Sequence, residues 1–147
     1  MVALRNFTDD VFVLQKNQYQ SMESKEIQKM ISEWNKKEFQ DKYFEMFAII
    51  NNSIVVGSIS LYQHSKSVIS FGVDVFEGYR KCGFGKEAMR LAMDNAKRQE
   101  YKIVSQQIRT NNIASIALHQ SLGFETNDYT YINKRGNEVV IYLKSLL

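Results

Sequence analysis

The Gly-rich segment over residues 78–85 is the part of the sequence whose residue types most clearly suit ligand binding. It reads Gly-Tyr-Arg-Lys-Cys-Gly-Phe-Gly, and apolar residues at helical spacing follow it. Glycine lets the main chain turn tightly and approach a ligand closely. The first amides of the following helix have no partner within the helix, so a pyrophosphate group binds well there. Because Arg80, Lys81 and Lys86 add positive charge, we predict a phosphate-binding loop.

Two common phosphate-binding motifs do not fit this segment. A Walker loop requires Lys and then Ser or Thr after its second glycine, but Phe84 and Gly85 follow Gly83. A dinucleotide-binding fingerprint also requires an acidic residue about 20 residues further on. The next predicted strand has Ser-Gln-Gln at 105–107 instead.

A third pattern does fit, and it has two parts. Arg80-x-x-Gly83-x-Gly85 follows a predicted strand that ends in Val-Asp-Val at 73–75. After a further 27 residues, the segment 112–124 reads Asn-Ile-Ala-Ser-Ile-Ala-Leu-His-Gln-Ser-Leu-Gly-Phe. Together these motifs resemble the GNAT superfamily of acyl-CoA-dependent N-acyltransferases. The resemblance is most specific over residues 71–124 and extends to the order of elements along the whole chain.

The resemblance implies a binding site for acetyl-CoA that is built mainly from main-chain groups. It places the thioester carbonyl against a main-chain N–H of the preceding strand, which we assign to Val75 as an oxyanion donor. Asn112 is expected to cap the following helix and to contact the cofactor arm. The residues expected to bind the pantetheine arm are Val73, Asp74 and Val75, and those expected around the pyrophosphate are Arg80, Lys81, Cys82, Gly83, Phe84, Gly85 and Lys86.

The acid of the reaction is a position at which this sequence departs from the resemblance. Where the second motif usually carries a Tyr that protonates the departing thiolate, this chain has His119. An imidazole can donate a proton near neutral pH. We therefore name His119 as the candidate general acid, beside the alternative that it faces solvent or caps a contact.

The base is also not at its usual positions. The two positions that carry a Glu in relatives hold Ser70 and Gln107 here, and neither takes up a proton at pH 7. An amine of pKa about 10.4 is neutral in only about one molecule in 2,500 at that pH, a cost near 4.6 kcal/mol. Two alternatives for the base follow. One is water relayed by Ser70 and Gln107, and the other is a carboxylate, Glu45 or Asp74. Cys82 is not expected to act as a nucleophile, because the family transfers directly to the amine.

The elements that position these residues can be read from the hydrophobic pattern. Thr8 is a candidate helix cap, and Trp34 is expected in the core. We predict strands over 4–7, 43–50, 54–62, 68–75, 102–109, 124–131 and 138–143, and helices after residue 8 and over 24–39, 86–100 and 113–122. The three strands before the loop form an antiparallel meander. The fold class is mixed α/β, and the resemblance implies a mostly antiparallel central sheet with a splayed parallel strand pair, flanked by helices.

Length and composition restrict the setting. The 147 residues carry a net charge of +3 and one cysteine, so we expect a single domain over 1–147, no internal disulfide and a cytoplasmic location. No signal peptide or membrane span is expected. Acidic and basic residues interleave, which argues against a nucleic-acid partner. No metal is expected, and a monomer and a homodimer both remain possible.

Two hypotheses from these residues lead the others. The first is an enzyme that transfers an acetyl group from acetyl-CoA directly to a primary amine of a small molecule or peptide in a ternary complex. The second is a non-catalytic acyl-CoA-binding module, because three familiar catalytic positions hold Ser70, Gln107 and His119. A nucleic-acid-binding or protein-interaction domain without cofactor is a third. The acceptor stays open, since the glutamates over 23–45 are not dense enough to indicate a cationic one.

Overall fold

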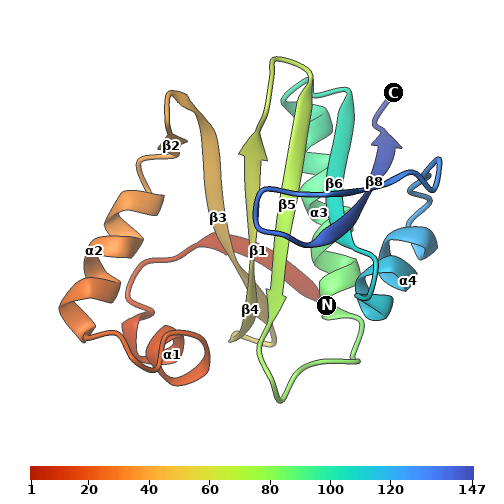
Figure 1. Cartoon of the computed structure of the whole chain (residues 1–147). Coiled ribbons are helices and arrows are strands. Elements are labelled where there is room, and N and C mark those ends of the chain that lie inside the picture. The colour runs from red at the N-terminus through yellow and green to blue at the C-terminus, as the bar shows by residue number, and fades with distance from the viewer. The chain divides into compact units, whose positions relative to one another are not determined.

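The computed structural model describes residues 1–147 and shows a mixed α/β fold (Figure 1). The elements are β1 (Val2–Asn6), α1 (Val11–Asn17), α2 (Ser24–Trp34), β2 (Glu38–Phe39), β3 (Lys42–Asn51), β4 (Ile54–Gln63), β5 (Val68–Val75), α3 (Phe84–Arg98), β6 (Ile103–Arg109), α4 (Ile113–Ser121), β7 (Thr130–Ile132) and β8 (Glu138–Ser145). The hydrogen-bonded strand order is β1-β3-β4-β5-β6-β8-β7, with β2 paired to β3. β5 and β6 run parallel, whereas β1–β3, β3–β4, β6–β8 and β7–β8 are antiparallel. The expected fold class is confirmed.

The chain forms two compact units. The first comprises Met1–Gln63 and Phe71–Ala92, and the second comprises His64–Ser70 and Met93–Leu147. Strand β5 contributes its first three residues to the second unit and the remainder to the first. None of the helices is long and apolar enough to cross a membrane.

The core of the first unit lies where α1 and α2 cover the strands, beside β3 in Figure 1. Both alternating sets of residues in 43–50 are largely apolar, which is typical of a strand covered on both faces. Strand β3 is buried in this way, because the successive residues Phe47, Ala48 and Ile49 are all buried. The Trp34 ring lies 5.5 Å from that of Phe7, which confirms its place in the core. The buried members of this cluster are Phe7, Leu14, Ile27, Ile31, Ala48, Val55 and Phe76.

Helix α2 ends at Trp34, so the predicted helix over 24–39 is too long. The Asn35 side chain donates to the Phe7 carbonyl at 2.9 Å, and Lys37 has a φ of 57°, which ends the helix. The next residues pair with the start of β3 as strand β2. Gln40 and Asp41 join these strands with φ values of 52° and 64°, the conformation of a tight hairpin turn.

Thr8 is not the cap of α1, contrary to the prediction. The residue before the helix is Asp10. Its carboxylate accepts hydrogen bonds from the Arg5 guanidinium at 2.9 Å and from the Thr8 main-chain N–H at 2.8 Å. The hydrogen bond from Arg5 is the main reason that the pKa of Asp10 falls below its usual value. The Asp10 carboxylate thus links the end of β1 to the start of α1 and makes no side-chain cap hydrogen bond to the helix.

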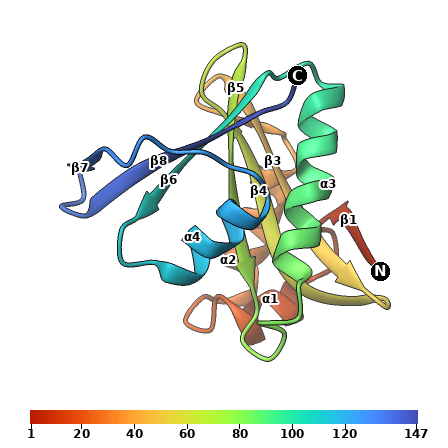
Figure 2. The same cartoon turned by 90° about the vertical axis from the view of Figure 1, so that its right-hand side faces the viewer.

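The second unit is built on the long antiparallel pair β6 and β8, which Figure 2 shows with β7 at the outer end of the hairpin. Gly123 ends α4 with a φ of 85°, as its position predicts. The predicted strand over 124–131 is mostly wrong: only Thr130–Ile132 forms β7, and Glu125 makes an isolated bridge to Leu143. The reason is local, since the Asn127 side chain accepts the N–H of Tyr129 at 3.0 Å and turns the chain.

Candidate functional site

The loop between β5 and α3 has the conformation that an anion-binding turn requires. Lys81 and Gly83 have φ values of 63° and 82°, in the left-handed region. Where residues of this conformation alternate with right-handed ones, successive main-chain N–H groups point to the same side and form a concave surface of donors. No atom lies within 4 Å of the position that a Cβ on Gly83 would take. The Glu87 N–H makes the first hydrogen bond of α3, to the Gly83 carbonyl. The amides over 84–86 therefore have no partner within the helix.

The end of β5 is held against this loop. The Arg80 Nε donates to the Val75 carbonyl at 2.9 Å, and its guanidinium lies 3.9 Å from the Asp74 carboxylate. A Cβ on Gly85 would stand 3.5 Å from the side chains of Val73 and Val75, so α3 begins close to the strand. Among the sequence-predicted site residues, the structure thus brings those over 73–75 and 80–86 together in the first unit.

The other two predicted site residues lie on α4 in the second unit. Asn112 caps the helix, since its Oδ1 accepts the Ser115 N–H at 3.1 Å. His119 lies one helical turn from Ser115 and is only 5% exposed. Its ring packs edge-on against Phe124, with centroids 4.9 Å apart. The capping prediction is confirmed for Asn112, whereas its contact with a cofactor stays a prediction.

Both ring nitrogens of His119 are engaged inside the protein. Nδ1 lies 2.7 Å from the Ser115 carbonyl oxygen, so it carries the ring hydrogen and donates it. Nε2 is then an acceptor, and the Gln106 side-chain amide lies 3.2 Å from it. Burial lowers the pKa of His119 below its usual value, and the hydrogen bond to Ser115 opposes this only in part. This geometry favours a neutral, structural imidazole, and the expected role as acid stays a prediction.

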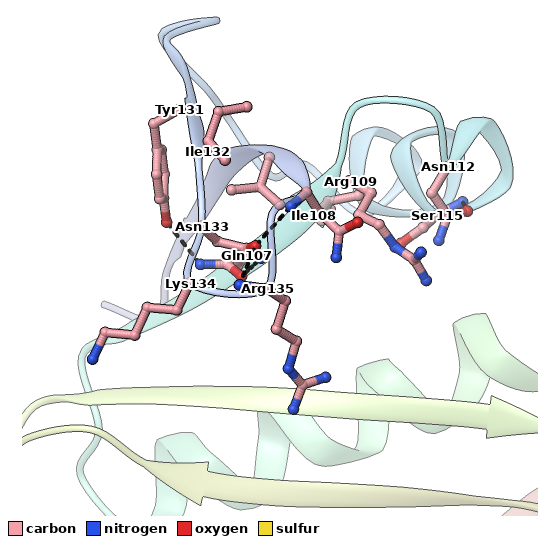
Figure 3. A pocket seen from close by; sticks show the side chains of 12 residues that line it. Gln107, Ile108, Arg109, Asn112, Ser115, Tyr131, Ile132, Asn133, Lys134 and Arg135 are labelled. Atoms are coloured by element: carbon pink, nitrogen blue, oxygen red, sulfur yellow. Dashed lines mark hydrogen bonds between the residues drawn. The ribbon is translucent and has the colours of Figure 1, made fainter.

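An open cavity of about 890 Å³ lies between α4 and the β7–β8 hairpin (Figure 3). Gln107 lies at its centre: its amide nitrogen donates to the Tyr131 hydroxyl at 2.7 Å, and its amide oxygen accepts from Asn133 at 3.0 Å. The lining residues are Gln107, Ile108, Arg109, Asn112, Ser115, Tyr131, Ile132, Asn133, Lys134, Arg135, Asn137 and Val139. We call this cavity the hairpin pocket.

Residues 3–125 match the Acetyltransferase (GNAT) domain family. The chain belongs to the GNAT acetyltransferase family. The expectation of an acetyl-CoA-dependent acetyltransferase is confirmed at the level of the family. None of the curated proteins matches this GNAT chain in sequence.

Solved structures of the same fold agree with the family. One is a protein from Salmonella typhimurium with its cofactor acetyl-CoA, at a TM-score of 0.76 and 15% identity, covering 100% of this chain and 95% of that one. Spermidine N-acetyltransferase from Vibrio cholerae, in complex with CoA and spermine, has a TM-score of 0.78 and 13% identity, covering 99% and 95%. A ribosomal-protein-alanine N-acetyltransferase from Brucella melitensis has a TM-score of 0.75 and 18% identity, covering 97% and 99%. At these identities the likeness concerns the fold.

Ser70, one of the two positions where a base was expected, has a partner in this GNAT protein. Its hydroxyl oxygen lies 2.8 Å from the Nε2 of His64. The turn after β4 makes this possible, because the His64 main-chain N–H bonds to the Val68 carbonyl and returns the chain onto β5. In the sequence, Gln-His-Ser-Lys-Ser over 63–67 indicates only a turn, so His64 is not among the predicted site residues. The only available signal was an imidazole six residues from the serine.

The two carboxylates named as alternative bases are placed differently. Glu45 is buried, at 8% exposure, and accepts hydrogen bonds from the side chains of Asn6 and Tyr43, with the Lys37 ammonium 3.5 Å away. Its oxygens are thus already engaged. Asp74 is half-exposed beside Arg80. No group of three or more His, Cys, Asp or Glu residues is arranged to hold a metal ion.

The buried His119 predicts a pH dependence of stability. Its usual pKa is 6.5, and burial lowers it in the folded protein. As the pH falls below about 6.5 the unfolded chain takes up a proton that the folded chain resists, so the free energy of unfolding must decrease. We expect the thermal midpoint to fall between pH 7.5 and 5.5. Scans of His119→Phe over the same range should show a smaller fall, although this variant starts lower by about 1–3 kcal/mol because the Ser115 and Gln106 groups lose their partner. Equal slopes would contradict the assignment.

Proposed function

We propose that this GNAT protein transfers the acetyl group of acetyl-CoA directly to a primary amine of a small molecule or peptide within a ternary complex. One observation carries the proposal: the left-handed loop conformation at Lys81 and Gly83 leads into helix amides without partners. These groups fit a pyrophosphate, because they offer several N–H donors and no side chain obstructs Gly83. We also propose that residues 1–147 form one domain, because the family match takes residues from both units.

Main-chain groups do most of the binding in this proposal. The amides over 81–86 hold the pyrophosphate, and Arg80 acts as a brace that fixes the loop to the Val75 carbonyl. The main chain over 73–75 bonds the pantetheine arm, and Asn112 contacts it from α4. The Val75 N–H donates to the thioester oxygen as negative charge develops there. Bound acetyl-CoA supplies the activated acetyl group.

The proton acceptor in the proposal is His64, acting through Ser70. With the ring hydrogen on Nδ1, Nε2 accepts the Ser70 hydroxyl hydrogen across the 2.8 Å contact. Ser70 Oγ can then take a proton from the acceptor ammonium through intervening water, because Ser70 lies five residues, about 16 Å of extended strand, before Val75. Imidazole is the side chain best suited to accept protons near neutral pH. His119 is assigned a structural role, and a thiol of pKa about 8.5 needs only modest help to leave as thiolate.

Initial-velocity kinetics test the transfer itself. We expect release of CoA to depend on the amine, the N-acetyl amide to appear by mass spectrometry, and double-reciprocal lines to intersect. Cys82 is exposed, and its only hydrogen-bond contact is to the Arg80 carbonyl at 3.4 Å, so no base activates it. Cys82→Ala should therefore keep at least about half of the activity.

The opposite results are distinct. Parallel lines together with a dead Cys82→Ala variant would indicate a covalent acetyl-enzyme and overturn direct transfer. Acetyl-CoA binding without release of CoA by any amine would favour the acyl-CoA-binding module over the enzyme.

A further inference from the structure

We infer that the hairpin pocket binds an anionic group, a carboxylate or a phosphate, of the acceptor amine. That the anionic group belongs to the acceptor amine rests on the proposed function, whereas the anion site itself rests on the geometry of the second unit. It selects amines that carry a negative charge, such as amino acids, and disfavours polyamines.

The distribution of charge between the two units is the first support. The second unit contains eight of the 19 Lys and Arg residues but only five of the 16 Asp and Glu residues. The first unit contains eleven of each. The whole net charge of +3 therefore belongs to the unit that contains the hairpin pocket, although the sequence as a whole shows no basic cluster.

The second support is that the charges around the pocket have no counter-ion. Arg109, Lys134 and Arg135 line the pocket, and no acidic side chain does. None of the three forms an ion pair with a carboxylate. Glu138, the nearest acidic residue along the chain, accepts a hydrogen bond from Thr110 at 2.8 Å. Glu138 itself is not among the residues that line the pocket.

The third support is that hydrogen bonds hold the loop before any ligand binds. Asn133 Oδ1 accepts the main-chain N–H groups of Arg135 and Asn137, both at 3.0 Å, and its amide donates to Gln107. Figure 3 shows Lys134 and Arg135 extending from the same side of this loop. Since Gln107 donates to the Tyr131 hydroxyl, the phenol keeps its own hydrogen for a further acceptor.

These features specify an anion. Three cations, a phenol hydrogen and side-chain amides are donors that a carboxylate or phosphate oxygen can satisfy. A polyamine would meet like charges there and find no carboxylate. Arg109 and Arg135 offer the planar pair of N–H groups that binds carboxylate or phosphate through two bonds.

Matched pairs of amines test the acceptor assignment. Arginine and agmatine, and tyrosine and tyramine, differ only in the carboxylate. We expect kcat/KM to be at least about tenfold higher for the amino acid of the preferred pair. Arg135→Gln and Arg109→Gln should remove that preference through KM, while the acetyl-CoA affinity stays unchanged. Lys97→Gln, which removes an exposed cation of the same unit outside the pocket, should keep the preference.

A binding measurement separates the anion site from turnover. Inorganic phosphate is titrated into the protein saturated with CoA, and amide signals are followed by NMR. We expect the amide signals of residues 133–137 to shift. The same shift should require an at least about tenfold higher phosphate concentration in Arg109→Gln/Arg135→Gln. Phosphate binding without any turnover would support the anion site and contradict the proposed acetyl transfer. The inference would be overturned if phosphate shifted no amide signal or if the enzyme preferred the decarboxylated amines. A loss of CoA affinity in the variants would also overturn it, because a phosphate of the cofactor would then occupy the pocket.

Discussion

Gly57→Ala is expected to lower kcat/KM for acetyl transfer by about 100-fold or more. Gly57 lies in β4, and a Cβ there would overlap the Asp74 carbonyl oxygen and stand 2.9 Å from the Val75 Cα. Both are main-chain atoms, so the strand end must move. That strand end provides the proposed oxyanion donor, and a displacement of about 1 Å in such a group costs about two orders of magnitude.

The control for this variant is Gly78→Ala, which precedes residues 80–86, the ones proposed to hold the pyrophosphate. A Cβ on Gly78 meets no atom within 4 Å, and its φ is outside the left-handed region, so the substitution should leave activity within about twofold. Thermal unfolding of both variants, followed by kinetics well below the lower midpoint, separates loss of fold from loss of catalysis. A folded Gly57→Ala protein with full activity would show that the main chain at Asp74 and Val75 does not take part.

Features that depend on the main chain and its neighbours in sequence could be predicted. Gly83 must adopt a positive φ at a loop before a helix, and Asn112 stands where a cap is needed, so the residue type alone indicates the conformation. The parallel β5–β6 pair was available only through the resemblance to the GNAT superfamily, and the helix between the two strands is the connection that a parallel pair requires.

Features that depend on contacts distant in sequence could not. The burial of His119 requires α4 to lie on β6 and β8, where Gln106 and the Tyr142 ring, 6.4 Å away, enclose it. The end of α2 requires the Phe7 carbonyl, 28 residues earlier, to attract Asn35. Likewise the unpaired charge of the hairpin pocket becomes visible only when Arg109 and the hairpin loop are seen to line one cavity.

Ser70→Ala and His64→Gln are each expected to lower kcat/KM at pH 7 by about 100-fold, within the range of a lost general base. The reason is the protonation of the acceptor, because only about one lysine-like amine in 2,500 is neutral at that pH. A hydroxyl that passes the proton to His64 across 2.8 Å lets the enzyme bind the abundant ammonium form and remove its proton within the complex. Since the two residues act in one route, the double variant should lose little more than either single one.

The pH profile distinguishes this role from a structural one. The wild-type protein binds the ammonium form and removes its proton, so kcat/KM should be nearly flat from pH 7 to 9. Without the relay the enzyme must wait for neutral amine, and kcat/KM of both variants should rise about tenfold per pH unit over that range. Ser65→Ala, in the same turn but with only a main-chain hydrogen bond to Val68, should retain the flat profile. A variant that lost activity equally at every pH would show that Ser70 and His64 support the strand rather than move the proton, and the base would then have to lie elsewhere in the acetyltransferase.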